Sequence, residues 1–447
     1  MPGARSRALA ARLGAVESRN VTWLGEDFPV FWERALGSNV RDADGNRYVD
    51  LTAGFGVAVP GHRHPKVVKA IRDQAGRLAH GMGDVHPPEI KVELLEELAR
   101  SAPVREPRIV LGGSGSEAVE IALKTARLHT GRPGVVAFTG AYHGLTYGAL
   151  SVTDGERFRA PFEDQLQPHL LRAPFPHPFR PPAALRGAGD DDPGAISRAA
   201  VDEVRRLLDT GEGAAVGAVL LEPIQGRGGD VVPPEGFLSE LAGLCRERNL
   251  LLILDEVYTG FGRTGVDFAC RREGVEPDLL CVGKALGGGM PISACVGAGP
   301  VMEAWPPSSG EAVHTSTFLG HPIACAAALA CLEVIREEGL AERAALVGRR
   351  WRRDLDELAS RHACVGEARG AGLMLGLDLV RPDGGRTPAP GIARRVVVEA
   401  LRRGWIVLAG GSAGNVLSFS PPLNVPEELL GRATGVLDEI LSAVGTP

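Results

Sequence analysis

The sequence predicts an α/β fold in which a mostly parallel sheet carries helices on both faces. Three observations support this fold class. Short apolar runs alternate with helical patterns from about residue 60 to residue 300, and such alternation is typical of parallel sheets. Some of these runs end in charged residues, at the edge where open parallel sheets bind ligands. The chain has 447 residues, enough for two or three domains' worth of core.

The predicted strands of this sheet are short and rich in Val, Leu and Ile. They are residues 108–112, 134–139, 216–223, 251–256 and 278–283. Helical patterns at 116–128 and 235–249 lie between them. Nearer the start of the chain, residues 39–52 alternate around an Asp-Gly turn, which predicts a hairpin.

Two domains are expected. The large domain covers residues 60–325 and includes a surface loop at 173–194, which is rich in Pro, Gly and Asp. After about residue 325, two long helical patterns and short strands predict a smaller α+β domain. We expect residues 326–447 to form it together with residues 1–59.

Composition and charge exclude several classes of protein. The net charge is −6, which gives no electrostatic basis for binding nucleic acid or an anionic membrane. The longest uncharged stretch, 285–302, contains too many glycines and prolines for a good membrane span. The first twenty residues are basic without an apolar core, so they do not predict a secretory signal, although they weakly resemble a transit peptide.

No metal site or disulfide framework is expected. The seven cysteines are odd in number and lack CxxC spacing, so a reducing cytoplasm is the expected location. His62 and His64 have no further ligands at metal spacing, and His143 is expected either to be structural or to support a residue that contacts the ligand, rather than to bind a metal.

The stretch 109–124 reads as a strand, a glycine-rich turn and a helix. Ser114 and Glu117 fit a capping box, and the exposed N–H groups at such a helix start can bind phosphate. Gly113, Gly115 and Ala118 also match the dinucleotide fingerprint. That fingerprint requires a carboxylate at the end of the next strand, which here ends in "FTGAYHG". A nicotinamide oxidoreductase is therefore disfavoured.

Two charged residues stand at strand ends. Asp255 follows the apolar run 251–254, and an ionised carboxylate there needs a partner. Lys284 follows the apolar run 278–283 and precedes three glycines after Leu286, where desolvation would lower its pKa and make it a nucleophile. Pyridoxal phosphate needs a phosphate site, an acid facing the pyridine nitrogen, and a Schiff-base lysine. The three features together point to that cofactor.

The chain resembles the class III (omega-type) aminotransferases of the fold type I pyridoxal-phosphate superfamily. The matching motifs run in order from about residue 40 to 425. They are "GHRHPKVVKAI", "GSGSEAVEIALKTAR", "FTGAYHG", "EPIQGRGG", "LDEVYTGFGRTG", "LLCVGKALGGGMP", "TFLGHPIACAAAL", "RGAGLMLGLDL" and "SPPL". The resemblance implies a large domain with a mostly parallel sheet, a smaller α+β domain, and pyridoxal 5'-phosphate as cofactor.

The resemblance also assigns roles to residues. It implies that Lys284 carries the cofactor and that Asp255 pairs with the pyridine nitrogen. Val257 and Tyr142 would lie on opposite faces of the ring, and Glu222 would lie near the cofactor. For Val257 we expect an extended backbone continuing from Asp255, so that both side chains point the same way.

The phosphate contacts implied by the resemblance come from two subunits. Gly115 and Ser116 would bind the phosphate from one chain. Thr317 would reach it from the partner subunit, which implies a homodimer with shared active sites.

The sequence departs from the family pattern at three places near the expected site. Tyr258 stands where many members have a glutamine that hydrogen-bonds the cofactor's ring oxygen, a bond that a phenol can also donate. Phe55 stands where a smaller aliphatic residue is common, and it either lines the substrate pocket or belongs to the core. Ser418 replaces an arginine that binds the substrate carboxylate, and Arg227 replaces the glutamate that pairs with that arginine. Arg227 either takes over carboxylate recognition or points to solvent.

The expected function is transfer of an amino group from an amino acid or amine to a keto acid or aldehyde, by a ping-pong Schiff-base mechanism. On the same fold, an amino-acid racemase or epimerase, a decarboxylating transaminase and an aminomutase remain alternatives. A catalytically silent cofactor-binding regulator is disfavoured by the presence of Lys284 and Asp255.

Overall fold

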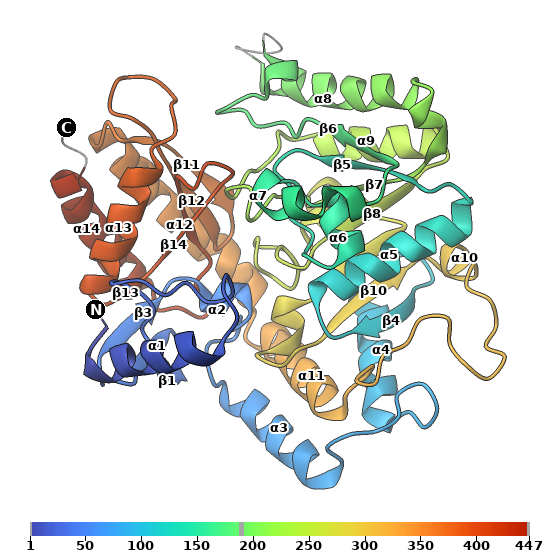
Figure 1. Ribbon diagram of the computed structural model, residues 1–447, viewed down its shortest axis with the longest axis horizontal. Helices are drawn as coiled ribbons and strands as arrows, with labels where there is room; N and C mark the ends of the chain where they lie inside the picture. Colours follow the sequence, from blue (N-terminus) through green and yellow to red (C-terminus); the bar gives the residue numbers. More distant parts are fainter. Residues whose placement is uncertain (1, 187–191, 445–447) are drawn as a thin grey trace.

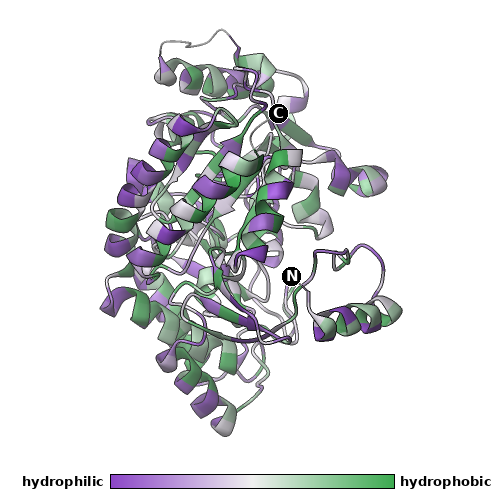
Figure 2. Ribbon diagram, turned by 90° about the vertical axis from the view of Figure 1, so that its left-hand side faces the viewer, coloured by the Kyte–Doolittle hydropathy of each residue, from purple (hydrophilic) through white to green (hydrophobic). Residues whose placement is uncertain are grey.

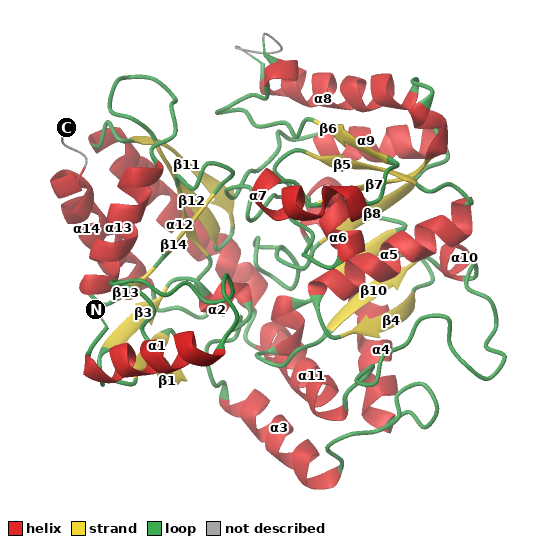
Figure 3. Ribbon diagram, in the orientation of Figure 1, coloured by secondary structure: helices red, strands yellow, loops and turns green. Residues whose placement is uncertain are grey.

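The computed structural model describes residues 2–186 and 192–444. Its centre is a seven-stranded sheet in the order β4-β10-β9-β8-β7-β5-β6, drawn in yellow on the right of Figure 3. The strands are β4 (Arg108–Gly112), β5 (Gly134–Phe138), β6 (Leu170–Ala173), β7 (Val216–Leu221), β8 (Leu251–Asp255), β9 (Leu279–Val282) and β10 (Ser293–Gly297).

The prediction of a mostly parallel sheet is confirmed. Strands β6, β5, β7, β8 and β9 pair in parallel, and only β10 runs antiparallel to its neighbours β4 and β9. The five predicted strands match observed ones to within two residues at each end. Strands β6 and β10 were not predicted. β10 lies inside the stretch 285–302, which had been considered only as a membrane span; all five of its residues are buried.

Helices cover both faces of this sheet. The connection from β4 through α5 (Gly115–Thr130) to β5 crosses the sheet in one direction, and α6 (Tyr147–Val152) continues that way toward β6. The connections through α8 (Pro193–Leu208) and α9 (Phe237–Glu247) run back in the opposite direction. Because such crossovers are right-handed, the two sets of helices lie on opposite faces. Figure 2 shows that the helices of the molecule carry both hydrophilic and hydrophobic residues.

The predicted capping box is present at the start of α5. Ser114 Oγ accepts a hydrogen bond from the backbone N–H of Glu117 at 3.2 Å. The Glu117 carboxylate in turn accepts from the N–H of Gly113 at 2.6 Å. These bonds fix where α5 begins, and the helix ends at Gly131, which has a left-handed backbone.

Two four-stranded sheets stand beside the large sheet. One has the order β1-β2-β3-β13 and the other β11-β12-β15-β14. The first contains β1 (Trp32–Leu36), β2 (Asn39–Asp42), β3 (Arg47–Asp50) and β13 (Trp405–Ile406). The second contains β11 (Val365–Ala371), β12 (Met374–Leu379), β14 (Leu408–Gly410) and β15 (Val416–Phe419). β2 and β3 form the hairpin predicted at 39–52.

The N-terminal and C-terminal segments share one of these sheets. Strand β13 pairs in parallel with β3, although more than 350 residues separate them. Figure 1 shows helices α1 (Ala4–Val16) and α14 (Glu427–Val444) on this same side of the molecule. We therefore propose that 1–59 and 326–447 act as one unit. The boundary at 325 falls inside α11 (Pro322–Glu337), which packs on α3 (Pro65–Arg77).

The remaining helices surround these sheets. They are α2 (Ala53–Gly56), α4 (Glu89–Ser101), α7 (Glu156–Arg159), α10 (Gly299–Met302), α12 (Leu340–Arg361) and α13 (Pro390–Arg402). No helix in the described part of the chain is both long enough and apolar enough to cross a membrane. The loop predicted at 173–194 is observed up to 186 and contains one short 3₁₀ turn, whereas 187–191 lie outside the described residues.

Candidate active site

Three ionisable residues lie at the carboxyl ends of adjacent parallel strands. Glu222 directly follows β7, Asp255 is the last residue of β8, and Lys284 stands two residues after β9. These strands are neighbours in the order β9-β8-β7. The carboxyl edge of an open parallel sheet is where such folds bind ligands, so the sheet brings the three predicted residues to one place.

The start of α5 lies at this edge and presents backbone N–H groups. The first N–H groups of a helix have no partner within the helix, so those of Gly115 and Ser116 can bind an anion. No side chain fits at Gly115, because a Cβ atom there would lie 2.9 Å from Cγ1 of Val257. The same methyl group would lie 3.4 Å from a Cβ at Gly283, next to Lys284. The side chain of Val257 therefore lies between the start of α5 and the backbone next to Lys284.

Asp255 is buried and pairs with a histidine. Its Oδ2 atom lies 2.7 Å from Nδ1 of His143, and the carboxylate is 5% exposed. The other ring nitrogen of His143 is buried and has no hydrogen-bond partner among the described residues. For His143 a structural or supporting role was expected, but its pairing with Asp255 was not identified, because 112 residues separate the two.

The expected extended backbone at Val257 is wrong. Strand β8 ends at Asp255, and the next residues form a turn. The backbone N–H of Val257 donates to Oδ1 of Asp255 at 3.0 Å, which closes the turn over the carboxylate. Val257 nevertheless lies against Gly115, at the edge of the sheet where the cofactor was predicted.

Lys284 has the environment of a nucleophilic amine. Burial lowers its pKa; the negative charges of Asp255 and Glu222 oppose this shift, and the positive charges of Arg227 and Arg263 add to it. Its backbone has a φ of +38°, a strained value for a residue with a side chain. Its Nζ atom lies 4.1 Å from the centre of the Tyr258 ring.

The hydroxyl group of Tyr258 is hydrogen-bonded within the chain. Its hydroxyl donates to Ser420 Oγ at 2.8 Å, and Ser420 donates to the carbonyl of Thr52 at 3.1 Å. The phenol has one hydrogen, which is used here rather than directed at a cofactor oxygen. Burial and the charge of Asp230 raise the pKa of Tyr258 to about 12, so the phenol keeps that hydrogen.

Glu222 holds two loops of the site together. Its carboxylate accepts hydrogen bonds from the N–H of Tyr142 at 3.0 Å and from the N–H of Gly226 at 2.9 Å. Burial raises the pKa of Glu222, and the charge of Asp255 adds to this, while His143 opposes it. Tyr142 and the loop that carries Arg227 are thus fixed side by side.

Arg227 stacks on the ring of Tyr142. Its guanidinium carbon lies 4.6 Å from the centre of that ring and 5.7 Å from the centre of the Phe158 ring. The side chain is exposed, and it makes no ion pair or side-chain hydrogen bond with the described residues. A stacked guanidinium with free donors can bind a carboxylate.

Ser418 is hydrogen-bonded to an acid that was not identified from the sequence. Its hydroxyl lies 2.6 Å from Oδ2 of Asp230, whose side chain is fully buried. Burial raises the pKa of Asp230 to about 7. The sequence did contain a signal for Asp230: it is the acidic residue of the glycine-rich stretch "GRGGD", three residues after Arg227.

Phe55 and Thr317 are both on the surface of this chain. Phe55 is 65% exposed, which makes a core role wrong. It belongs to a run of left-handed residues, and a Cβ at the next residue, Gly56, would lie 2.5 Å from the Tyr258 ring. Thr317 is exposed, and within the described part of the chain no hydrogen bond joins it to the other predicted residues.

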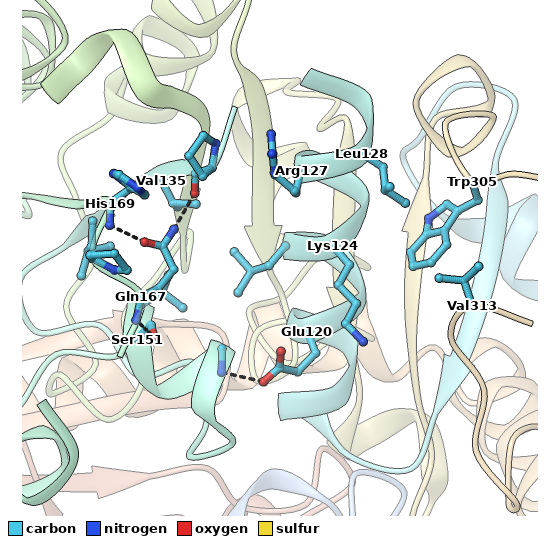
Figure 4. Close-up of a pocket in the computed structure, with 16 residues that line it drawn as sticks. Glu120, Lys124, Arg127, Leu128, Val135, Ser151, Gln167, His169, Trp305 and Val313 are labelled. Atoms are coloured by element: carbon cyan, nitrogen blue, oxygen red, sulfur yellow. Dashed lines mark hydrogen bonds between the residues drawn. The ribbon is translucent and has the colours of Figure 1, made fainter. Parts of the chain in front are cut away.

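A hollow lies away from these residues, along the outer side of α5. It has a volume of about 660 Å³ and its walls are mainly apolar. Figure 4 shows Lys124, Leu128, Trp305 and Val313 along it, and no predicted site residue lines it. Its size does not make it the reaction site, because the buried acids and Lys284 are absent from it.

The residues at the sheet edge fit pyridoxal phosphate. The free N–H groups of Gly115 and Ser116 suit the phosphate. The buried Asp255 is oriented by Val257 and His143, and a remaining lone pair of its carboxylate can face the ring nitrogen of the cofactor. Lys284, with its lowered pKa, suits covalent attachment.

Comparison with known proteins gives a consistent result. The sequence profile of the class III aminotransferases matches residues 23–441. A 4-aminobutyrate aminotransferase of Mycobacterium leprae is 38% identical over 99% of this chain and 96% of its own length. The 5-aminovalerate aminotransferase DavT of Pseudomonas aeruginosa is 38% identical over 97% and 98%. The PLP-bound crystal structure of an amine transaminase from an uncultivated Pseudomonas species superposes with a TM-score of 0.88, at 31% identity over 96% of this chain and 99% of that one.

Proposed function

The chain belongs to the class III aminotransferase family, and we propose that its amino donor carries a carboxylate group bound by Arg227. The chain is a pyridoxal-phosphate-dependent aminotransferase, which moves an amino group between a donor and a carbonyl acceptor. When bound, the cofactor supplies an electron-accepting ring. The structure must therefore supply a nucleophile, a base, a charge opposite the ring and a means of recognising the donor.

Residues at the sheet edge can do the first three. Lys284 Nζ can hold the cofactor covalently and, once displaced by the donor, remove the proton from the carbon that carries the donor's amine. Asp255, fixed by His143 at 2.7 Å, can keep a negative charge facing the ring nitrogen. Tyr142 and Val257 can flank the ring, and Gly115 can bind the phosphate.

The position of Arg227 carries the proposal about the donor. Its guanidinium stacks on Tyr142 and has no acidic partner among the described residues. Its charge also lowers the pKa of Lys284, so it lies within electrostatic range of the nucleophile. A carboxylate held there by two parallel hydrogen bonds would place the rest of the donor near Lys284.

The relatives suggest which carboxylates to test first. Two of them are named for 4-aminobutyrate and 5-aminovalerate, in which the amine and the carboxylate are at opposite ends. We propose ω-amino acids of this kind as the donor class and a keto acid or aldehyde as the acceptor.

Substitution of Arg227 tests the proposal. Arg227→Ala is assayed with 4-aminobutyrate and with n-butylamine, which has the same number of carbons but no carboxylate. We expect kcat/KM for 4-aminobutyrate to fall by the equivalent of roughly 1.5–3 kcal/mol, the size of a lost hydrogen bond to a charged group, while n-butylamine changes little. Equal losses for both donors contradict the proposal.

Arg157→Ala is the matched control for this experiment. Arg157 is also exposed and lies 4.4 Å from the centre of the Phe158 ring, so it shares the stacking but not the contact with Tyr142. Acceptor consumption is measured in the same assays. One keto acid consumed per product formed supports transamination, whereas product without acceptor consumption supports racemisation, decarboxylation or amine migration.

We also propose a homodimer and a cytoplasmic location. Thr317 is exposed on a segment that includes Val313, which is 71% exposed beside the apolar hollow at α5. A second copy of the chain would cover this surface and receive Thr317 at its phosphate site. All seven cysteines are buried free thiols, which suits a reducing compartment.

A further inference from the structure

The hydroxyl groups of Ser418 and Tyr258 lie near Lys284, with the buried carboxylate of Asp230 behind them. We call these three residues the hydroxyl wall. The ring of Tyr258 touches Lys284 Nζ at one face and carries its hydroxyl to Ser420. Ser418 lies two residues before Ser420, on strand β15, and its hydroxyl donates to Asp230 at 2.6 Å. Asp230 raises the pKa of Tyr258, so its charge is close to that phenol.

The hydrogens of these hydroxyl groups point into the protein. Above pH 7 the Asp230 carboxylate accepts the hydrogen of Ser418. Tyr258 donates to Ser420, and Ser420 donates to the carbonyl of Thr52. The oxygens of Ser418 and Tyr258 are therefore left with lone pairs only. Ser418 is half-buried, whereas Asp230 behind it is fully buried.

Asp230 is held in place by its backbone and not by an ion pair with the described residues. Its backbone has a φ of +53°, and the carbonyl of the preceding Gly229 accepts from Arg369 Nε at 2.7 Å. The guanidinium of Arg369 also bonds Glu367 and Asp378. No cation bonds Asp230 itself within the described residues, and its Oδ1 atom is buried without any partner.

The charges around Asp230 come from several elements. Arg369 on β11 lowers its pKa, Glu222 after β7 raises it, and burial outweighs both. Tyr258 stays neutral beside it. The wall formed by Asp230, Ser418 and Tyr258 is thus an acceptor of hydrogen bonds with a negative charge behind it. Arg227 has the opposite hydrogen-bonding role and the opposite charge, because its guanidinium only donates hydrogen bonds and is positive.

We propose that this wall binds a second ammonium group on the amino donor, with Asp230 supplying the charge and Ser418 the contact. The inference deepens the proposed function, because an ammonium at this wall and a carboxylate at Arg227 together describe a diamino monocarboxylic acid. The amine to be transferred would then face Lys284, and the second ammonium would face Ser418. An ammonium has three donors and no acceptor, which suits oxygens that have only lone pairs to offer.

Four donors of four carbons test this inference. They are n-butylamine, 4-aminobutyrate, 1,4-diaminobutane and 2,4-diaminobutyrate, which carry neither group, the carboxylate alone, the second amine alone, and both. The holoenzyme and its Asp230→Asn variant are assayed at pH 8, where the native carboxylate is ionised. In the variant we expect kcat/KM to fall at least about tenfold for the two diamines, because the ammonium loses its attraction to the charge behind Ser418. The other two donors should change little.

Ser418→Ala is the second variant, and it removes the contact without changing the buried charge. We expect it to weaken the same two diamines by a smaller factor. Cofactor content and Tm of each variant are measured so that a misfolded protein is recognised. If either folded variant affects donors with and without a second amine equally, the inference is overturned.

Failure of this inference can be distinguished from failure of the proposed function. The comparison of 1,4-diaminobutane with n-butylamine involves no carboxylate, so it does not depend on Arg227. The comparison of 4-aminobutyrate with n-butylamine involves no second amine, so it does not depend on Asp230. Equal responses of the first pair to Asp230→Asn overturn the ammonium site, and equal responses of the second pair to Arg227→Ala overturn carboxylate recognition.

Discussion

His143 Nδ1 lies 2.7 Å from Asp255 Oδ2, and both side chains are buried at the carboxyl edge of the central sheet. The histidine comes from the turn after β5 and the aspartate from the end of β8. Because Oδ1 of Asp255 is used by the N–H of Val257, His143 fixes the remaining oxygen. The orientation of the acid thus depends on a residue outside its own strand.

Replacement of His143 should reduce turnover without removing the cofactor. We expect His143→Phe to lower kcat by about 10–100-fold, the size of a lost hydrogen bond to a charged group. Retained cofactor is checked by absorbance of the purified protein. His169→Phe is the matched control, because His169 is exposed and far from Asp255 in the fold. Unchanged kcat in the His143 variant would remove this residue from the function of Asp255.

Replacement of Asp255 should have a larger effect. Asp255→Asn keeps the shape of the side chain and the bond to Val257 but removes the negative charge. We expect kcat to fall by roughly two or more orders of magnitude while the fold persists, since charge stabilisation in a buried site is worth several kcal/mol. Rates and Tm are measured together. A near-native rate would exclude Asp255 from the mechanism.

Lys284 should be the residue that carries the cofactor. Lys284→Ala should lose turnover but still bind the cofactor non-covalently. Borohydride reduction of the native protein followed by peptide mapping identifies the attachment site. Lys124 is the useful comparison, because it is exposed on α5 and lines the apolar hollow. A label on Lys124 or on any lysine other than 284 contradicts the assignment.

Residues whose chemistry follows from local sequence could be predicted. Asp255 and Lys284 each stand at or just after the end of an apolar run, and a parallel sheet brings such ends together. The capping box at Ser114 could also be identified, because its partners are three residues apart. These features need no knowledge of how distant parts of the chain pack.

Features that depend on distant or fine geometry could not be predicted. The bond from Tyr258 to Ser420 joins residues 162 positions apart, and the pairing of Ser418 with Asp230 spans 188. The turn at Val257 results from a side-chain acceptor that competes with the extended backbone. Strand β10 lacks charge alternation because it is buried on both faces between β4 and β9.

The functional unit should be a homodimer that needs Thr317. Light scattering of the holoenzyme at assay concentration should give twice the mass of the chain. Thr317→Val keeps the shape of the side chain but removes its hydroxyl, so we expect weaker cofactor retention on dialysis with an unchanged dimer. Thr315→Val is the control, because Thr315 is exposed on the same segment and bonds Asp84 of its own chain. An active monomer would contradict the shared site.

The stability of the protein should depend on Asp230 in a direction opposite to that of most acids. Burial raises the pKa of Asp230 from 3.8 to about 7, so the folded chain holds a proton that the unfolded chain releases between these values. Stability from this group is therefore greatest at low pH, falls as pH rises from about 4 to 7, and is level above that. Asp230→Asn cannot titrate but can still accept the Ser418 hydrogen. Relative to the native protein, the variant should gain about 2–3 kcal/mol between pH 5 and pH 8, from roughly 1.4 kcal/mol per pKa unit. Paired Tm measurements at the two pH values check this, and a constant difference in Tm would mean that Asp230 is ionised throughout.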